Sequence, residues 1–341
     1  MNQKHGIYVN CKNSADAMKM FPLKVLKKNF NINLVGSPDS AEVIIDFIER
    51  KENILLRRKD KKFLIIAGDN LKFKKNLFSL IESFFGKTPF KEKKYKIMDF
   101  LDKIIPKNIA KIPIISFFNN YDKLLLDKFR ENKIYLITTN KIKRKNSISI
   151  PLFIQNYSNR LNKLRDKRIP TIKDLSKKKF CAFIVSSNSS RERVDFFKKL
   201  SKYKRIDSYG KVMNNMGDII QDQDWKYNPK IFENYKFVIC FENSFAEDYI
   251  TEKLLNVMFA NSIPIYRGAP NTKDYFNTKS FINFDDYGSY EKIVNKIIEL
   301  DKDDKKYLKF LDQEWFIDNK IPKKIDDKEK ALIQFYEQLF N

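Results

Sequence analysis

The chain has 341 residues, of which 43% are hydrophobic and 14% aromatic, and this length predicts two domains with a core each. Only 8 residues are Gly and 11 are Pro, which excludes a low-complexity or disordered chain. The formal charge of +24 indicates an acidic partner, but the lysines are scattered and form no single basic helix or arm, which argues against nucleic acid as that partner.

A ligand that carries a diphosphate, or an anionic membrane surface, accounts for the charge equally well, and a general enrichment in lysine would need no partner. The sequence has no run of about 18 apolar residues, and its first residues lack the apolar core of a signal peptide. We therefore expect a cytoplasmic protein, with the inner face of the membrane as a candidate peripheral location.

Cysteine and histidine usage restricts the chemistry. Of the three cysteines, Cys181 and Cys240 lie in predicted buried strands and Cys11 lies far from both, so we expect reduced core thiols. The one histidine, His5, stands at the start of the chain, which argues against Ser-His-Asp or Cys-His catalysis and most zinc patterns. Carboxylates are then the natural candidates for a catalytic base.

Short apolar runs alternate with helical patterns in the first 159 residues, which predicts a parallel sheet with crossover helices. A helix is expected at 18–29, and strands are expected at 7–9, 32–35, 43–47, 63–67, 114–117, 135–138 and 148–153. The lysine-rich segment 90–111 is expected to be a solvated helix and loop, with a surface insertion beside the substrate as the alternative.

Asp69 directly follows the strand predicted at 63–67, within the tripeptide Gly-Asp-Asn. Catalytic residues of open parallel sheets often lie at the carboxyl ends of strands, whereas the same tripeptide is also common in ordinary turns. Asp69 is therefore a candidate base, and Glu82 is a more remote alternative.

Residues 160–179 are strongly charged and contain Pro170, which predicts a linker between a first domain at 1–159 and a second at 180–322. The remaining residues, 323–341, include an amphipathic helix that we expect to pack back on the first domain. A membrane anchor is the alternative for this helix. In the second domain a strand at 180–185 precedes a helix at 192–200, whose first turn contains Arg193, where a guanidinium can bind phosphate oxygens bidentately.

The stretch 235–270 predicts a strand, loop, helix and strand, with the buried strand at 235–241 and Thr251 as the N-cap of the helix. Ligands of such units lie beyond the carboxyl end of the strand, beside the helix N-terminus. Lys253 there suits a diphosphate and Glu252 suits sugar hydroxyls, so the pair fits a nucleotide-sugar. A capped amphipathic helix with a solvated Glu-Lys pair is the alternative. The polar residues gathered at this place are Glu242, Asn243, Ser244, Tyr249, Thr251, Glu252 and Lys253.

The same stretch resembles the donor-binding signature of the α1,3/4-fucosyltransferases, glycosyltransferase family 10. The resemblance rests on F-E-N-S at 241–244, D-Y-I-T-E-K at 248–253 and I-P-I-Y-R-G-A-P at 263–270, and it continues in S-F-I at 280–282 and D-D-Y at 285–287. It also covers the Ser-Asn pair at 187–188 followed by Arg193, and I-D-S-Y-G at 206–210. In the family the arginine binds the donor diphosphate, which implies the same for Arg193, and the last motif implies that Tyr209 and Gly210 lie beside the nucleotide.

This resemblance implies a GT-B fold, in which two Rossmann-like, doubly wound parallel-sheet α/β domains face a central cleft. It implies GDP-β-L-fucose as donor and an inverting transfer to an N-acetyllactosamine-like or lipopolysaccharide glycan, through an α1,3 or α1,4 linkage. Family members usually carry Glu as the base, where Asp69 stands here. Arg193 and Lys253 would stabilise the departing GDP, so no metal and no further cofactor is expected. The alternatives are another nucleotide-sugar and, in a different class, a basic nucleic-acid-binding protein.

Overall fold

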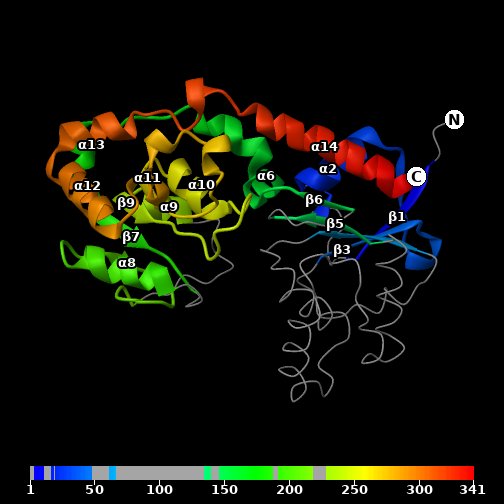
Figure 1. The fold of residues 1–341 in the computed structure, drawn as a ribbon, viewed down its shortest axis with the longest axis horizontal. Coiled ribbons are helices and arrows are strands. Elements are labelled where there is room, and N and C mark those ends of the chain that lie inside the picture. Colours follow the sequence, from blue (N-terminus) through cyan, green and yellow to red (C-terminus); the bar gives the residue numbers. More distant parts are fainter. Residues whose placement is uncertain are drawn as a thin grey trace, which may run out of the picture. The chain divides into compact units, whose positions relative to one another are not determined.

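The computed structural model describes residues 4–10, 17–18, 20–47, 61–66, 134–139, 146–186, 191–217 and 228–341 (Figure 1). The chain forms two compact units. The first comprises Met1–Thr138, Ile142–Ile148 and Leu332–Asn341, and the second Thr139–Lys141 and Ser149–Ala331. Asp69, Glu82, Cys11, the lysine-rich segment 90–111 and the strand expected at 114–117 lie outside the described residues.

The first unit contains a six-stranded sheet in the order β2-β1-β3-β4-β5-β6. Neighbouring strands from β2 to β5 pair in parallel, as the alternation of strands and helices predicted. The core strands are short and apolar, and Ile7, Ile44, Phe63 and Ile137 are fully buried. The strands are β1 (His5–Val9), β2 (Ile32–Leu34), β3 (Val43–Phe47), β4 (Lys62–Ile66), β5 (Ile134–Thr138) and β6 (Ser147–Ser149).

The strand expected at 148–153 is wrong in its second half. β6 ends at Ser149, and the apolar run continues as the helix α6 (Leu152–Tyr157) after Pro151 at the N-cap. Proline cannot donate to a sheet ladder but suits the start of a helix, and the consecutive residues Phe153 and Ile154 are both fully buried. A short apolar run alone does not distinguish a buried strand from a buried helix.

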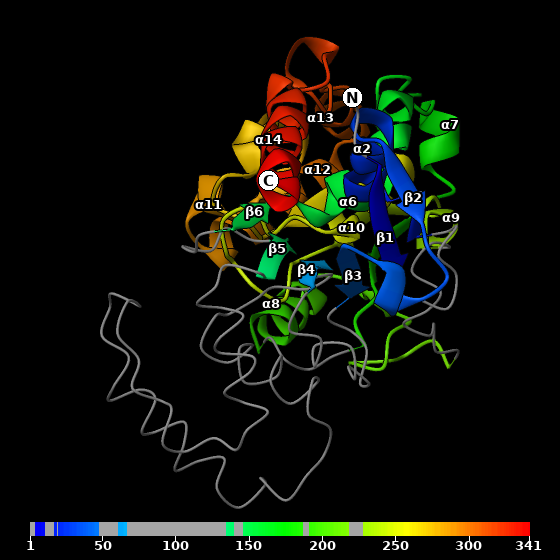
Figure 2. The same ribbon diagram turned by 90° about the vertical axis from the view of Figure 1, so that its right-hand side faces the viewer.

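The carboxyl-terminal residues belong to the first unit. The helix α14 (Lys323–Phe340) begins in the second unit, and its last turns lie alongside α2 (Phe21–Asn29) in Figures 1 and 2. The Tyr336 hydroxyl donates to the Pro22 carbonyl at 2.8 Å, and the Phe340 ring stacks on His5 with centroids 4.1 Å apart. Leu332, Phe335, Tyr336 and Leu339 are buried against the unit, so this apolar face does not serve as a membrane anchor. None of the described helices is long and apolar enough to cross a membrane.

Residues 160–179 do not form an exposed linker between domains. They contain most of a 3₁₀ helix, η3 (Ser158–Leu164), and the short helix α7 (Ile172–Leu175), and they belong to the second unit. Leu161, Leu164 and Leu175 anchor this segment because their side chains are buried, while most of its charged residues point into solvent. The charge therefore marks a solvated surface of the second unit, and α6 also lies within this unit.

The second unit contains a five-stranded sheet in the order β11-β10-β9-β7-β8, and neighbouring strands are parallel throughout. Figure 1 shows α8 on one side of β7 and β9 and α10 on the other. The expected fold class is thus confirmed as two parallel-sheet α/β units. The strands are β7 (Lys179–Phe183), β8 (Asp207–Ser208), β9 (Tyr235–Ile239), β10 (Ile263–Tyr266) and β11 (Ile282–Asn283). The helices are α8 (Arg191–Ser201), α9 (Asn228–Phe232), α10 (Glu252–Phe259), α11 (Phe284–Tyr287), α12 (Tyr290–Lys302) and α13 (Asp304–Leu311), with 3₁₀ turns η5 (Thr272–Asp274), η6 (Thr278–Ser280) and η7 (Ile317–Asn319).

The order of strands reverses between β7 and β9. The chain passes from β7 outward to β8, returns to β9 on the other side of β7, and continues through β10 to β11. The two strands pair with Phe183 opposite Ile239, so their carboxyl ends lie side by side. In doubly wound sheets, ligands bind outside the carboxyl ends of the strands at such a switch point.

Cys181 and Cys240, on and just after these two strands, are free and buried, as the sequence predicted. Burial raises the pKa of both thiols, so both are protonated at neutral pH.

Candidate active site

Two segments reach the switch point of the second sheet from different crossovers. β7 leads to α8, which contains Arg193 in its first turn, and β9 leads to a loop at 240–251 that ends at α10. We call residues 240–251 the donor-side loop. The sequence singled out both segments, and the fold brings their residues together.

The donor-side loop starts as an extension of the sheet. The backbone N–H of Cys240 donates to the Ile265 carbonyl at 2.9 Å, and that of Glu242 donates to the Arg267 carbonyl at 2.8 Å. These bonds carry Glu242 to the edge of the sheet and direct its side chain inward. A methyl group on Gly268 would lie 2.9 Å from Cγ of Glu242 and 2.0 Å from Oη of Tyr266, so only glycine leaves room for both side chains.

Glu242 is fully buried and makes its contacts within the protein. Its Oε1 accepts the backbone N–H of Thr251 at 2.8 Å, and the Thr251 hydroxyl lies 3.0 Å from Oε1 and 2.9 Å from Oε2. Lys253 Nζ lies 3.3 Å from Oε2. Burial raises the pKa of Glu242, and the positive charge of Lys253 counteracts this. The expectation that Glu242 contacts a ligand is thus replaced by a supporting position beneath the loop.

Thr251 is the N-cap of α10, as predicted, and its hydroxyl oxygen accepts from the backbone N–H of Lys253 at 3.4 Å. The helix forms because Leu254, Leu255, Val257 and Met258 present an apolar face, and all four are buried. The cap and the buried face together fix the direction in which the helix N-terminus, with its partial positive charge, points.

Lys253 lies in the first turn of α10, with Nζ 3.0 Å from Oγ1 of Thr251 and 3.3 Å from Oε1 of Glu252. Its side chain is 27% exposed, and its ammonium group is paired with the buried carboxylate of Glu242. Burial lowers the pKa of Lys253, but Glu242 and Glu252 outweigh this effect and raise it overall. Lys253 therefore carries a positive charge at neutral pH.

Arg193 is 3% exposed, and its Nε and Nη2 atoms have no hydrogen-bond partner among the described residues. Burial lowers its pKa, while electrostatic interactions with Glu242, Tyr249 and Glu252 oppose that change. A buried guanidinium that lacks a full set of acceptors costs free energy unless a ligand supplies them. Two free parallel N–H groups match a phosphate or carboxylate.

Tyr209 and Gly210 have structural roles that the sequence did not predict. The Tyr209 hydroxyl donates to Tyr235 Oη at 2.7 Å, and Tyr235 in turn donates to Asp207 at 2.8 Å, so this hydroxyl is engaged within the unit. A methyl group on Gly210 would lie 2.1 Å from the Val185 carbonyl oxygen, so glycine is required for the close approach of two backbones.

The remaining predicted residues belong to the donor-side loop and to the first turn of α10. Asn243 is exposed at the start of the donor-side loop, and Ser244 is half-buried beside it. Tyr249 is buried near Arg193, and Glu252 lies on the first turn of α10 with its side chain 22% exposed. The cluster thus combines two cations with an exposed amide and a half-buried carboxylate, a set that can bind a phosphate group and sugar hydroxyls together.

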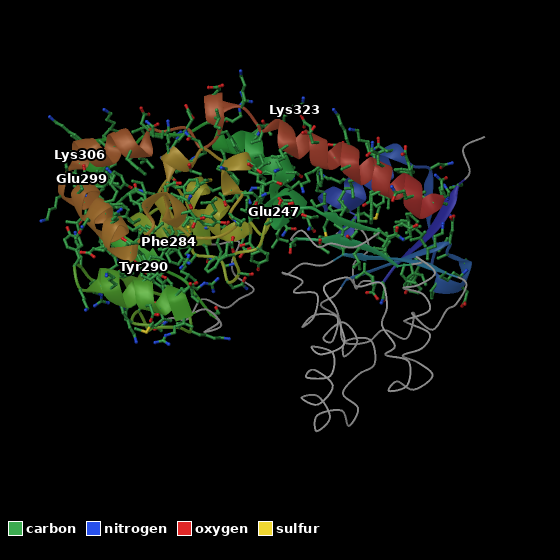
Figure 3. The ribbon with its side chains drawn as sticks, in the orientation of Figure 1. Glu247, Phe284, Tyr290, Glu299, Lys306 and Lys323 are labelled. Carbon is green, nitrogen blue, oxygen red and sulfur yellow. The ribbon has the colours of Figure 1, made fainter. Side chains whose placement is uncertain are left out.

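One neighbouring residue was missed by the sequence analysis. Arg267, just after β10, lies over the rings of Phe245 and Phe284, with its guanidinium carbon 4.5 and 4.1 Å from their centroids. It also forms an ion pair with Glu192 at 3.0 Å and donates to the Tyr290 hydroxyl at 3.2 Å. Figure 3 shows Phe284 and Tyr290 close together near α8. Because Glu192 precedes Arg193, Arg267 fixes the helix turn that contains Arg193. Its position within the I-P-I-Y-R-G-A-P segment was the available signal.

Comparison with known proteins finds similarity in the part of the chain that contains this cluster. Residues 175–337 match the glycosyltransferase family 10 (fucosyltransferase) C-terminal domain. The chain is 30% identical over 138 residues to the α-(1,3)-fucosyltransferase FucT of Helicobacter pylori, which covers 40% of this chain and 28% of that protein. It is 36% identical over 138 residues to human 4-galactosyl-N-acetylglucosaminide 3-α-L-fucosyltransferase 9, covering 40% of this chain and 37% of that protein.

The relatives also include a GDP-fucose protein O-fucosyltransferase 3 of Xenopus tropicalis, 34% identical over 143 residues, which covers 39% of this chain and 29% of that protein. The matched region thus spans between about a quarter and somewhat over a third of these relatives, 28%, 37% and 29% of their lengths.

Solved structures extend the likeness of the fold to nearly the whole chain. A crystal structure of an α1,3-fucosyltransferase superposes with a TM-score of 0.62 at 16% identity, covering 98% of this chain and 90% of that one. A structure of an α1,3-fucosyltransferase with GDP-fucose gives a TM-score of 0.58 at 18% identity, covering 97% of this chain and 90% of that one. At these identities the comparison establishes the fold, which is of the GT-B type.

Proposed function

Because the chain belongs to glycosyltransferase family 10 through residues 175–337, we propose that it transfers L-fucose from GDP-β-L-fucose to a hydroxyl of a glycan acceptor, with inversion at C1. One observation carries the proposal. Arg193 and Lys253 come from the two crossovers that flank the switch point between β7 and β9. Lys253 Nζ lies 3.3 Å from the Glu242 carboxylate, and the charge of the same carboxylate also acts on Arg193.

In the proposed reaction the acceptor oxygen bonds to C1 of fucose as the bond from C1 to the β-phosphate oxygen breaks. Negative charge then grows on the departing GDP. Arg193 supplies N–H groups that are buried and have no hydrogen-bond partner among the described residues, and Lys253 supplies a cation fixed by Glu242 and Thr251. Groups held in place before the reaction stabilise such a charge better than groups that must reorganise.

The sugar and nucleotide contacts follow from what remains accessible. Glu252 and Asn243 present a carboxylate and an amide to solvent beside the two cations, and these groups are suited to fucose or ribose hydroxyls. Tyr249 and Ser244 complete the surroundings of the donor, while Tyr209 and Gly210 shape the backbone beside the nucleotide. Glu242 acts through Thr251 and Lys253 and does not touch the donor.

Asp69 is the proposed base that removes the proton from the acceptor hydroxyl. The prediction rests on its place after the strand β4 and on the family resemblance, since Asp69 lies outside the described residues. Asp69→Asn is expected to keep GDP binding while transfer falls to background. Transfer that survives in this variant would assign the base to another group.

No metal ion and no further cofactor enters the proposal, because two cations and a helix N-terminus supply the positive charge. The acceptor is proposed to be an N-acetyllactosamine-like or lipopolysaccharide glycan, linked α1,3 or α1,4. The names of two relatives, an α-(1,3)-fucosyltransferase and a 4-galactosyl-N-acetylglucosaminide 3-α-L-fucosyltransferase, support the first acceptor and the α1,3 linkage. The charge of +24 supports a second partner, an anionic membrane surface.

The test is a donor and acceptor panel. The protein is incubated with GDP-fucose, GDP-mannose and UDP-sugars in the presence of N-acetyllactosamine, and released nucleotide and product are both quantified. We expect transfer from GDP-fucose and from no other donor of the panel, and we expect NMR to show an α linkage in the product. Transfer only from another donor would keep the transferase and overturn fucose. Absence of binding to GDP combined with strong, salt-dependent binding to oligonucleotides would overturn the enzyme.

A further inference from the structure

Asp248, in the middle of the donor-side loop, has an unusual backbone conformation. Its φ is +66°, in the left-handed region, and its residue is 3% exposed. Aspartate tolerates this region better than most residues, but it remains there only when the surroundings hold it. The Asp248 carbonyl also accepts the backbone N–H of Ile250 at 2.8 Å, so the chain turns tightly just before Thr251.

One side of the Asp248 carboxylate is bound by the segment that follows β10. Oδ1 accepts hydrogen bonds from Asn271 Nδ2 at 2.9 Å and from the Tyr275 hydroxyl at 2.8 Å. The backbone N–H of Asp248 donates to Oδ1 of Asn271 at 2.9 Å. Asn271 and Tyr275 flank the turn η5, so Asp248 ties the donor-side loop to that turn in both directions.

The other oxygen is bound by two further residues of the second unit. Oδ2 accepts from the Ser149 hydroxyl at 2.5 Å and from Lys328 Nζ at 2.6 Å, and Lys328 Nζ also donates to the Ser149 carbonyl at 2.8 Å. Ser149 ends β6 and Lys328 lies in α14. Burial alone would raise the pKa of Asp248, but Lys328 and the hydrogen bonds lower it to about 2, so the group is a carboxylate at neutral pH.

Asp248 therefore has no role as a direct ligand of the donor. Its side chain is 4% exposed, and each oxygen already has two donors. The residues just after it are held as well, because the backbone N–H of Phe153 in α6 donates to the Ile250 carbonyl at 3.1 Å. The carboxylates of Glu242 and Asp248 thus hold the loop at two places. Both residues precede Thr251 and Lys253 in the chain.

We propose that Asp248 is a positioning residue, which holds the loop so that Thr251 and Lys253 meet the donor diphosphate in one geometry. A loop that is already ordered does not lose conformational entropy when the ligand binds, so its contribution appears as affinity. The inference rests on the proposed function, since Asp248 is inferred to support the contacts that bind the diphosphate of the donor.

The test compares Asp248→Asn with a matched control, Asp301→Asn. Asp301 is also a buried carboxylate, with its side chain 3% exposed and with hydrogen bonds from Tyr203 and Lys204 at 3.0 Å. It lies on α12, far from the loop. Figure 3 shows Glu247 of the donor-side loop and Glu299 of α12 at opposite ends of the second unit. Both variants lose one buried charge, so both report the cost to stability.

Dissociation constants for GDP and for guanosine are measured by calorimetry on the full chain, with the folded fraction checked by thermal unfolding. Asp248→Asn is expected to weaken GDP binding about tenfold and to leave guanosine binding within about twofold, the loss expected when a charged hydrogen bond is misplaced. Asp301→Asn is expected to lower the melting temperature and to leave both dissociation constants unchanged. A merely structural role for Asp248 would give the control's pattern.

Tyr275→Phe removes one hydroxyl donor to Asp248 and keeps the ring, so it serves if Asp248→Asn does not fold. It is expected to shift the GDP constant in the same direction by about threefold. Wild-type affinity for GDP in whichever of these two variants folds, or an equal loss for GDP and guanosine, would overturn the inference. A wild-type protein that does not bind GDP would instead overturn the proposed function, and the inference with it.

Discussion

Glu242 and Thr251 stand at opposite ends of the donor-side loop and are joined directly. Oε1 of Glu242 accepts the backbone N–H of Thr251 at 2.8 Å, and the Thr251 hydroxyl lies 3.0 and 2.9 Å from the two carboxylate oxygens. The residue that caps α10 is thus itself held by a buried carboxylate. The loop is closed by this pair before any ligand arrives.

Glu242→Gln should weaken the hydrogen bonds between residue 242 and Thr251. Glutamine keeps the shape of the side chain, but its amide nitrogen cannot accept from Thr251 or pair with Lys253. Because the site is fully buried, we expect the free energy of unfolding to fall by about 3 kcal/mol, as in other broken buried ion pairs, and GDP affinity to fall with it. Urea unfolding and GDP titration measure the two effects. Glu247→Gln, exposed in the same loop, is the control, and equal behaviour of the two variants would contradict the role of Glu242.

Gly268→Ala tests how tightly the support of Glu242 is packed. The added methyl group would lie 2.0 Å from the Tyr266 hydroxyl and 2.9 Å from Cγ of Glu242, so one of the two side chains must move. We expect a loss of about 1 to 3 kcal/mol in stability, as for other overpacked cores, and weaker GDP binding. Gly36→Ala is the control, because a methyl group there meets nothing within 4 Å. A Gly268 variant as stable as the Gly36 variant would show that Glu242 has room to move.

Local patterns were enough to predict most of the second unit. The strand β10, the helix α10 with its Thr251 cap and the approach of Arg193 to the same place follow from apolar runs and polar stops. The direction of the Glu242 side chain could not be predicted, because it depends on pairing with residues 265–267, which continues past the end of β9.

Other outcomes depended on packing between distant segments. The sequence around Tyr209 does not show that its hydroxyl forms a hydrogen bond with the hydroxyl of Tyr235. The charged stretch 160–179 resembled a linker because its few buried leucines are outnumbered by exposed charges. Burial of a minority of residues decides where a segment belongs, and composition averages over that minority.

The pH dependence of stability should reveal Asp248 in its folded environment. Its pKa in the folded protein is about 2, below the ordinary value of 3.8, so the folded state binds fewer protons than the unfolded state between these values. This contribution is present above about pH 4, amounts to about 2 kcal/mol, and is lost as the pH falls toward 2. The difference in unfolding free energy between wild type and Asp248→Asn should shrink over this window. A constant difference would mean that the carboxylate is not stabilised as a charge.

Transfer should not depend on a divalent metal ion. In the proposed site Arg193, Lys253 and the N-terminus of α10 meet the charge that develops on GDP, which is the part that a metal ion plays in other transferases. Initial rates are therefore expected to stay within about twofold after treatment with EDTA and after addition of Mg²⁺ or Mn²⁺. A rate that disappears with EDTA and returns with one metal ion would contradict this assignment.

The two cations of the site should differ in what they do for the protein without a ligand. Lys253 Nζ lies 3.3 Å from the fully buried Glu242, so Lys253→Met leaves that carboxylate uncompensated. Arg193 Nε and Nη2 lack hydrogen-bond partners among the described residues, so Arg193→Met removes a buried cation whose desolvation is only partly offset. We expect Lys253→Met to lower the free energy of unfolding by about 3 kcal/mol and Arg193→Met to leave it unchanged or to raise it by about 1 kcal/mol.

Both variants should nevertheless lose GDP affinity by about 1.5 to 3 kcal/mol, the size of a charged hydrogen bond to the diphosphate. Urea unfolding of the two variants without ligand, followed by calorimetric titration with GDP, separates the two properties. If the unpaired N–H groups of Arg193 serve the ligand, replacing Arg193 lowers GDP affinity and does not lower stability. A binding site can retain polar groups without partners that would not be kept for the stability of the fold. A clear loss of stability in Arg193→Met would mean that its guanidinium is satisfied within the protein, and the diphosphate would then need another partner.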